Sequence, residues 1–280
     1  MLEILLETLI DNLKLFPFLF AAYLLLEYLE HNASEKTLRL VRSSEKKGPV
    51  IGALCGIIPQ CGFSAAVANF YAARIVTLGT LIAVFLSTSD EMLPVMLAQS
   101  VPLNTIFMLI VYKFIYGLFC GILVDFCLRS KPLKADISAL CKDENCPCEK
   151  DPSIVKAAAF HSIKITLFIF AVTLCLNFGM EYISLSEPLK NALKMPLLSE
   201  ILSALFALVP NCSSSIILTQ LYIEESINLS TMLSGTLVGS GVGLLVLFRM
   251  NRHLKENLKI LLILYLCGVS GGLISNLILP

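Results

Sequence analysis

A proline–carboxamide–cysteine motif occurs twice in this chain, each time inside a long apolar stretch. The first copy is Pro59-Gln60-Cys61 and the second is Pro210-Asn211-Cys212. Proline lacks a backbone N–H donor and disfavours helix in the residue before it, so each copy predicts a broken helix. A bilayer tolerates broken backbone only where it is buried in protein or lines a wet cavity. Two such breaks, one per half of the chain, predict a transporter with internal repeats and a substrate site between them.

The hydrophobic content of the chain predicts a membrane protein. Of its 280 residues, 56% are hydrophobic and 15% are charged, whereas soluble proteins average about 25% charged residues. Apolar runs such as 157–183 and 259–279 exceed the roughly 18 residues that are needed to span a bilayer. The sequence therefore predicts an all-α polytopic membrane protein surrounded by the lipid bilayer. Its formal net charge of +0 gives no support for a nucleic-acid partner.

The longest polar segment, 128–156, separates four hydrophobic blocks from four others. The blocks lie at residues 15–31, 49–73, 75–97, 103–127, 157–183, 197–223, 230–248 and 258–279. The halves share landmarks in the same order, because a serine in a broken segment, Ser89 or Ser240, follows each motif proline by 30 residues. This correspondence predicts two repeats. The alternative is that glycine and serine are common in membrane helices anyway.

The distribution of Lys and Arg sets the orientation of these blocks. Cytoplasmic loops of membrane proteins carry an excess of Lys and Arg, and the polar segments 32–48, 128–156 and 249–259 are basic. If every block crossed the membrane, 32–48 and 128–156 would lie on opposite sides. They share a side if blocks 49–73 and 197–223 are re-entrant hairpins of two half-helices each. Sixteen of the 21 Lys and Arg residues then lie in the cytoplasm or at its surface.

The predicted fold is therefore two inverted repeats, each with three transmembrane spans plus one re-entrant helical hairpin. Residues 1–128 form the first inverted repeat, 129–156 a cytoplasmic Cys-containing linker, and 157–280 the second inverted repeat. An odd number of spans per half gives the halves opposite orientations. The hairpins then enter from opposite faces, and their tips meet near the midplane.

The motifs bring polar groups to these tips. A half-helix that ends before Pro59 leaves unpaired carbonyls at its negative pole, which suit a cation. The serines at 213–215 are expected to cap the half-helix that follows the second motif. The motif amides add oxygen and N–H groups, and Cys61 and Cys212 add sulfurs that bind metals as thiolates. Either cysteine taken alone could instead be a small buried hydrophobe.

Acidic residues within block 75–97 give the sharpest indication of chemistry. Asp90 and Glu91 fall about where the midplane is expected, and carboxylates inside a membrane mark ion sites, proton relays or ion pairs. The preceding residues 87–89 are Ser-Thr-Ser, which predicts that the helix unwinds there and exposes further oxygens. The alternative is that Asp90 only forms a structural ion pair with Lys113 of the next span.

The expected substrate site gathers residues from both motifs and from this segment. Its members are Gln60, Cys61, Ser64, Ser87, Ser89, Asp90, Glu91, Asn211, Cys212 and Ser213. The expected metal ligands are Asp90, Cys61 and Cys212. A second set in the linker, Cys141, Cys146 and Cys148, could capture metal before transport, although its spacing matches no standard zinc site. The alternative is that the linker is a plain solvated connection.

Several of these stretches together resemble a known family. They are Gly52–Ser64, Ser87–Glu91, the Cys-bearing linker followed by His161, and Pro210-Asn211-Cys212. They are similar to the ten-helix heavy-metal exporter family, which is also described as arsenic-permease-like or as a manganese transporter family. The resemblance extends over nearly the whole chain, and its ten helices equal six spans plus four half-helices. It implies metal efflux without fixing the metal. The family's linker is often richer in histidine, whereas this one holds cysteines and no histidine.

The sequence thus predicts a secondary transporter that exports a divalent transition-metal ion, with Mn²⁺ favoured, across the cytoplasmic (inner) membrane of a bacterium or archaeon. No Gly-x4-Gly-Lys-Ser/Thr loop is present, so no ATPase module is expected. We expect no enzyme activity and no cofactor, and H⁺ or Na⁺ is the candidate coupling ion. The alternative is a transporter of an oxyanion or small organic acid, such as arsenite or a carboxylate, with Asp90 binding a coupling cation. An intramembrane thiol enzyme using Cys61 or Cys212 is a further reading, and a homodimer is a candidate assembly.

Overall fold

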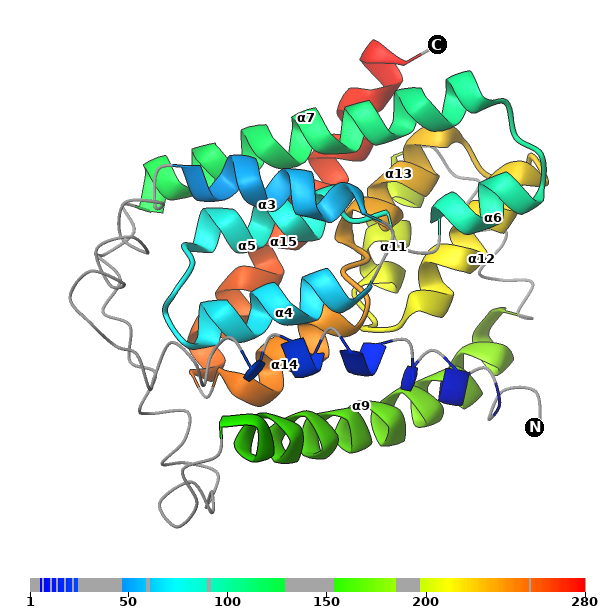
Figure 1. The fold of residues 1–280 in the computed structure, drawn as a ribbon. Coiled ribbons are helices and arrows are strands. Elements are labelled where there is room, and N and C mark those ends of the chain that lie inside the picture. Colours follow the sequence, from blue (N-terminus) through cyan, green and yellow to red (C-terminus); the bar gives the residue numbers. More distant parts are fainter. Residues whose placement is uncertain are drawn as a thin grey trace.

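The computed structural model of this chain consists of helices and the loops between them (Figure 1). It describes residues 6, 8–10, 12, 13, 15–17, 19–21, 23, 24, 47–58, 61–89, 92–128, 154–184, 197–251 and 253–279; within these, side chains at 61, 154, 157, 161 and 176–184 are not described. Every regular element in these ranges is a helix, which confirms the all-α prediction for that part of the chain.

The helices of the first half surround the first motif. They are α3 (Gly48–Ile57), α4 (Cys61–Ala72), α5 (Leu78–Ser87), α6 (Met92–Ala98) and α7 (Leu103–Leu128). The second half contains α9 (Ile154–Ser184), α11 (Leu198–Ala207), α12 (Cys212–Ile223), α13 (Leu229–Val238), α14 (Val242–Met250) and α15 (Leu254–Ile278). In Figure 1, α3 and α4 run in opposite directions across the molecule, as the two arms of a hairpin would.

Five segments of the described chain are long and apolar enough to cross a membrane. They are Leu78–Ala98, Leu103–Leu128, Ala158–Cys175, Leu229–Met250 and Leu254–Ile278. These correspond to five of the six predicted spans, and the sixth, block 15–31, is described only in part. The two blocks predicted as hairpins each contain two short apolar helices instead of one long helix. The chain is therefore a multi-pass membrane protein.

Glycine allows the helices of the first half to approach each other closely. A Cβ at Gly121 of α7 would lie 2.6 Å from the carbonyl oxygen of Gly79 and 2.7 Å from Cβ of Ala83, both on α5. Gly52 of α3 faces α5 in the same way, since its Cβ would lie 3.0 Å from the carbonyl oxygen of Thr80. In lipid, where hydrophobic driving force between helices is absent, such small residues let backbones come into van der Waals contact.

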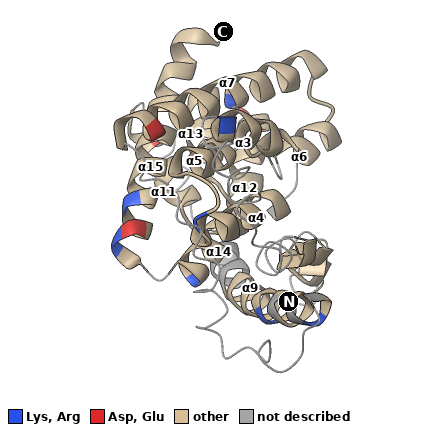
Figure 2. Cartoon of the chain, turned by 60° about the vertical axis from the view of Figure 1, so that its left-hand side comes forward, with Lys and Arg blue, Asp and Glu red and all other residues tan. Residues whose placement is uncertain are grey.

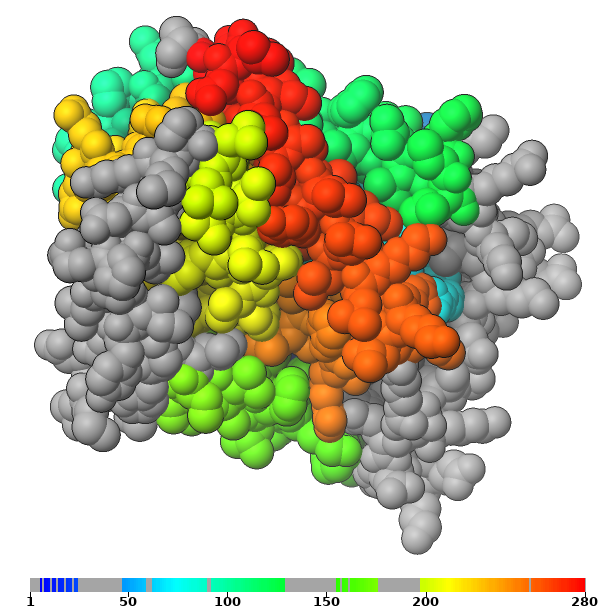
Figure 3. Space-filling view, turned by 180° about the vertical axis from the view of Figure 1, so that it is seen from behind, coloured from blue at the N-terminus to red at the C-terminus, as the bar shows by residue number. Residues whose placement is uncertain are grey.

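The second half repeats this arrangement with α11, α13 and α15. Gly272 of α15 packs on the Ser234 side chain of α13, and Ser203 of α11 donates a hydrogen bond of 2.7 Å to the Thr231 carbonyl of α13. Figure 3 shows α15 as a diagonal band on the surface, with α11 on one side and α7 on the other. In both halves, then, a broken helix (α5 or α13) lies between a short helix and a long one.

The two halves interlock through their short helices. Helix α4 of the first half packs against α14 of the second, and α12 of the second half contacts α6 of the first. The described N-terminal residues join this contact, because the Tyr23 hydroxyl lies 3.4 Å from both Asn69 Oδ1 on α4 and Met250 Sδ on α14. Each half is therefore held partly by helices of the other.

The packing of α5 on α7 predicts a steric effect at Gly121. Gly121→Val would place methyl groups against the α5 backbone, and we expect it to lower the unfolding free energy by about 1–3 kcal/mol, the usual cost of overpacking. Thermal unfolding in detergent micelles measures this. The control is Ile122→Val, because Ile122 is on the same helix and half its surface is exposed. Equal melting temperatures for the two variants would contradict the packing described here.

Candidate functional site

Two helices of the bundle are interrupted near their middles, one in each half. Helix α5 ends at Ser87, Thr88 has extended backbone (φ −60°, ψ 129°), and α6 begins at Met92. Helix α13 ends at Val238, and α14 begins after Gly241, whose φ is 53°. Such a positive φ is accessible to glycine without steric cost. The prediction that both segments unwind is confirmed for their described residues.

The short helix before the first motif ends where that motif predicts. Helix α3 stops at Ile57, and Ile58, the residue before the first motif proline, is extended with φ −68° and ψ 120°. This is the backbone conformation that a following proline imposes. At the second motif, Asn211 rather than the following serines caps α12, since its Oδ1 accepts from the Ser213 N–H at 3.4 Å. The predicted capping role of residues 213–215 was therefore wrong, and the Ser214 hydroxyl instead donates to the Asn211 carbonyl at 2.8 Å.

Lys113 joins the two interrupted helices. Its Nζ donates to the carbonyl oxygen of Thr88 in the first break and, at 2.9 Å, to the carbonyl oxygen of Thr236 in the last turn of α13. The side chain is 1% exposed. Both acceptors are carbonyls at the C-terminal, negative pole of a half-helix. A single cationic group thus lies against carbonyl oxygens from both halves of the chain.

Three close approaches lie at the breaks; two involve the predicted residues Ser87 and Ser64, and the third involves Ser215, which was not predicted. Ser87 at the end of α5 faces Gly56 in the last turn of α3. Ser64 of α4 lies against Gly243, where a Cβ would be 2.9 Å from Cβ of Ser64. Across the second break, a Cβ at Gly239 would lie 2.7 Å from the Ser215 hydroxyl of α12. The first turns of α4 and α12 therefore border the second break.

Several predicted residues are not placed by these contacts. Gln60, Asp90 and Glu91 lie outside the described residues, as do the linker cysteines Cys141, Cys146 and Cys148, and for Cys61 only the helical backbone is described. Ser89 is buried in the first break, while Cys212 and Ser213 are partly buried in the first turn of α12. Within the described ranges, no three His, Cys, Asp or Glu side chains lie close enough to hold a metal ion.

Two hydroxyl groups at the second break have no hydrogen-bond partner in the described structure. They are Oγ1 of Thr236 and Oγ of Ser240, whose side chains are 1% and 0% exposed. A buried hydroxyl without a partner costs about 1–3 kcal/mol. Such groups in a folded protein call for an explanation, and a role in binding a ligand is one of them.

Two carboxylates that the sequence analysis missed hold the outer ends of the broken helices. Asp125 accepts from the Gly79 N–H and from the Thr77 hydroxyl, both at 2.7 Å, at the start of α5. Glu200, 3% exposed, accepts from the Ser230 hydroxyl at 2.8 Å at the start of α13. An anion is favourable at the positive N-terminal pole of a helix. Their signal in the sequence was an acidic residue within an apolar block.

An ion pair links the loop after α4 to the start of α15. Arg74 binds Glu256 through two hydrogen bonds, Nη1–Oε1 at 2.5 Å and Nη2–Oε2 at 2.7 Å, and the Tyr71 hydroxyl also donates to Glu256. The hydrogen bonds to Glu256 raise the pKa of Arg74, so its charge is retained at any physiological pH. Figure 2 shows charged positions of both signs at this end of α15.

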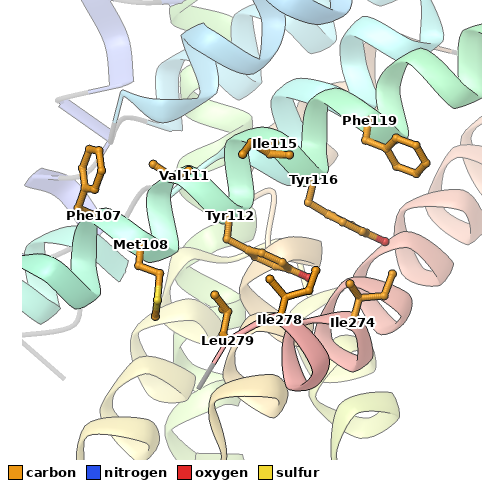
Figure 4. A pocket seen from close by; sticks show the side chains of 10 residues that line it. All are labelled: Phe107, Met108, Val111, Tyr112, Ile115, Tyr116, Phe119, Ile274, Ile278 and Leu279. Atoms are coloured by element: carbon orange, nitrogen blue, oxygen red, sulfur yellow. The ribbon is translucent and has the colours of Figure 1, made fainter.

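A groove between α7 and the C-terminal end of α15 is lined without any charged side chain. It has a volume of about 620 Å³ and is lined mainly by apolar side chains (Figure 4). Phe107, Phe119 and Ile278 in its wall are each more than half exposed. The two tyrosines in the wall direct their hydroxyls to α15, Tyr112 to the Gly271 carbonyl and Tyr116 to the Cys267 carbonyl. This surface therefore suits contact with lipid rather than with an ion.

Because the Ser240 hydroxyl has no hydrogen-bond partner in the described structure, we predict that its removal does not destabilise the protein. Ser240→Ala removes a buried group that forms no hydrogen bond, so we expect thermal stability in detergent to stay the same or to rise by about 1 kcal/mol. The matched control is Ser234→Ala, which removes a hydrogen bond of 2.9 Å to the Glu200 carbonyl and should lower stability by about 1 kcal/mol. A loss of stability in Ser240→Ala equal to that of the control would contradict the assignment.

Comparison with known proteins identifies one family. The model of a family described as "Putative, 10TM heavy-metal exporter" matches residues 1–183, which is more than half of the chain. The matched residues include the first motif, both helices of the first hairpin, the first break and Lys113. No curated protein and no solved structure matches the chain.

Proposed function

The chain belongs to the ten-helix heavy-metal exporter family, and on this premise we propose that it exports a divalent transition-metal ion, with Mn²⁺ favoured, by secondary transport. We place it in the cytoplasmic membrane of a bacterium or archaeon. The Lys113 contacts carry the proposal, because two interrupted helices from different halves direct carbonyl oxygens at one cationic group. Backbone carbonyls at unwound helices are how transporters of this architecture coordinate cations.

The oxygen-rich surroundings of the breaks favour a hard cation. The carbonyls of Thr88 and Thr236, with the hydroxyls of Thr236 and Ser240, are oxygen donors, and such donors suit Mn²⁺ better than soft metals. Asp90 is proposed as the charged ligand, and Cys61 and Cys212 as sulfur ligands that add selectivity for a transition metal. Gln60, Glu91, Asn211 and the serines at 64, 87, 89 and 213 complete the proposed site.

The Arg74–Glu256 ion pair supports the second re-entrant hairpin, block 197–223. If all eight hydrophobic blocks spanned the membrane, six spans would lie between residue 32 and residue 249, and Arg74, one span past 32–48, would lie opposite 249–257. An ion pair of 2.5 Å requires that both residues share a side. They do so if block 197–223 returns to the side from which it entered, because four spans then separate them. Block 49–73 precedes Arg74, so this pair does not test it.

Matching neighbours support the inverted repeats. Helix α5 packs between α3 and α7, as α13 packs between α11 and α15. The contacts between the halves also correspond, because α4 packs on α14 as α12 packs on α6. We propose that 1–128 and 157–280 are these repeats and that 129–156 connects them in the cytoplasm. The proposed mechanism is alternating access, in which the halves rock about a fixed midplane site and an H⁺ or Na⁺ gradient drives export.

Transport of an oxyanion or organic acid is the second candidate. The Asn211-capped start of α12 supports it, since a helix N-terminus attracts anions. The carbonyl oxygens at Thr88 and Thr236 would repel an anion, so we rank this candidate below metal export. Enzyme catalysis and a homodimer are not needed for either proposal.

Asp90→Asn tests the proposed charged ligand. Removing the charge should weaken Mn²⁺ binding by at least about tenfold, equivalent to about 1.4 kcal/mol, as measured by titration calorimetry of the detergent-purified protein. Asp125→Asn is the matched control, because Asp125 caps α5 away from the break and its loss should leave Mn²⁺ affinity unchanged. Equal affinity of wild type and Asp90→Asn would exclude Asp90 as a ligand.

Proteoliposome flux tests the substrate class directly. We expect wild-type protein to move Mn²⁺ in preference to Zn²⁺, arsenite and phosphate, and the rate to respond to an imposed pH or Na⁺ gradient. Transport of arsenite or phosphate without any divalent metal would support the anion transporter and contradict metal export.

Cysteine labelling tests the hairpins. In a background that lacks the native cysteines, Ser43→Cys and Arg74→Cys should react from the cytoplasmic face, and Lys190→Cys and Glu225→Cys from the other face. Reaction of residues 43 and 74 from opposite faces would show that block 49–73 spans the membrane.

A further inference from the structure

Lys113 occupies a position in which a transported cation would be expected. It is a lysine within a 26-residue apolar helix, and it is 1% exposed. Its ammonium contacts the backbone of both interrupted helices, the Thr88 carbonyl of the first half and the Thr236 carbonyl of the second. These residues are separated from Lys113 by 25 and 123 positions in the sequence, so the contact exists only because the halves meet.

A lysine in the middle of a membrane protein is costly to bury, and such residues face a functional path by default. Packing alone does not require this one, since the α5–α7 contact is made by Gly79, Gly117 and Gly121. The second break also offers more oxygen than the ammonium uses, because the hydroxyls of Thr236 and Ser240 have no partner in the described part of the chain. The breaks therefore hold oxygen donors to which the ammonium does not bond.

We infer that Lys113 is a built-in cation that takes the place of the metal ion when the transporter is empty. This inference rests on the proposed function. In the loaded state the metal ion contacts the break carbonyls, and the Lys113 ammonium has moved away from them. In the empty state the ammonium makes the two contacts described above and bridges the Thr88 and Thr236 carbonyls in place of the metal.

This exchange of cations has a consequence for the transport cycle. After the metal ion leaves, the carbonyls of both breaks and the Asp90 carboxylate proposed beside them would lack a compensating positive charge, and such a state is costly in a low-dielectric interior. The ammonium removes that cost, so the empty transporter can return to the cytoplasmic side. Lys113 is then needed for the return of the empty protein but not for movement of the loaded protein.

Two transport assays separate these steps. Metal-for-metal exchange uses only the loaded protein and is measured as ⁵⁴Mn²⁺ entry into proteoliposomes that contain unlabelled Mn²⁺. Net flux requires the empty protein to return and is measured with metal-free vesicles at a clamped membrane potential. Lys113→Gln keeps hydrogen-bond donors for the carbonyls but carries no charge, whereas Lys113→Arg keeps the charge. The control is Lys164→Met, which removes an exposed lysine of α9.

We expect Lys113→Gln to exchange Mn²⁺ at a rate within about twofold of that of wild type. Its net flux should fall by at least about tenfold, which corresponds to about 1.4 kcal/mol on the barrier of the return step. Lys113→Arg should retain measurable net flux, and Lys164→Met should resemble wild type in both assays.

Three results would overturn the inference. Full net flux in Lys113→Gln would show that the charge is not needed for return. Equal loss of exchange and net flux in both Lys113 variants, with monodisperse protein, would show that Lys113 serves the loaded state or only the fold. Absence of Mn²⁺ exchange in wild type would overturn the proposed function itself, and with it this inference.

Discussion

A lipid bilayer offers no hydrogen-bond partners to an open peptide group, and each unpaired group costs several kcal/mol. Every break in a membrane helix must therefore be enclosed by protein that supplies partners. Here the Lys113 ammonium supplies donors to the Thr88 and Thr236 carbonyls, and α12 and α4 cover the second break through Ser215 and Ser64. The breaks persist because the two halves of the chain enclose them together.

The same requirement explains how polarity is distributed through the molecule. Carboxylates hold the outer, N-terminal ends of α5 and α13, where Asp125 and Glu200 accept hydrogen bonds, and the cationic Lys113 lies at their inner, C-terminal ends. In α5 and α13, a negative charge thus lies at the positive N-terminal pole and a positive charge at the negative C-terminal pole. Between these ends glycine, alanine and serine make many of the contacts, and these small residues let the helix backbones approach closely.

The sequence was sufficient for features that depend on nearby residues. The end of α3 before the first motif proline and the interruptions at Thr88 and Gly239 follow from local proline, serine and glycine chemistry. The bridge from Lys113 to Thr236 does not, because those residues lie 123 positions apart and meet only after the halves pack. The N-cap of α12 was predicted wrongly for a different reason. Asn211 and the serines that follow it are all favourable N-cap residues, so residue type alone does not say at which of them the helix begins. Asp90, the residue on which the sequence places most weight, lies outside the described residues and stays a prediction.

The central claim is that one cation site lies between the two breaks and is shared by both halves. Manganese anomalous scattering from crystals of the wild-type protein grown with Mn²⁺ tests it most directly. The account predicts a peak between the Thr88 and Thr236 carbonyls, at oxygen-ligand distance from both, with the Lys113 ammonium displaced from those oxygens. A manganese peak confined to one half of the chain or to the linker, with Lys113 still bound to both carbonyls, would contradict it.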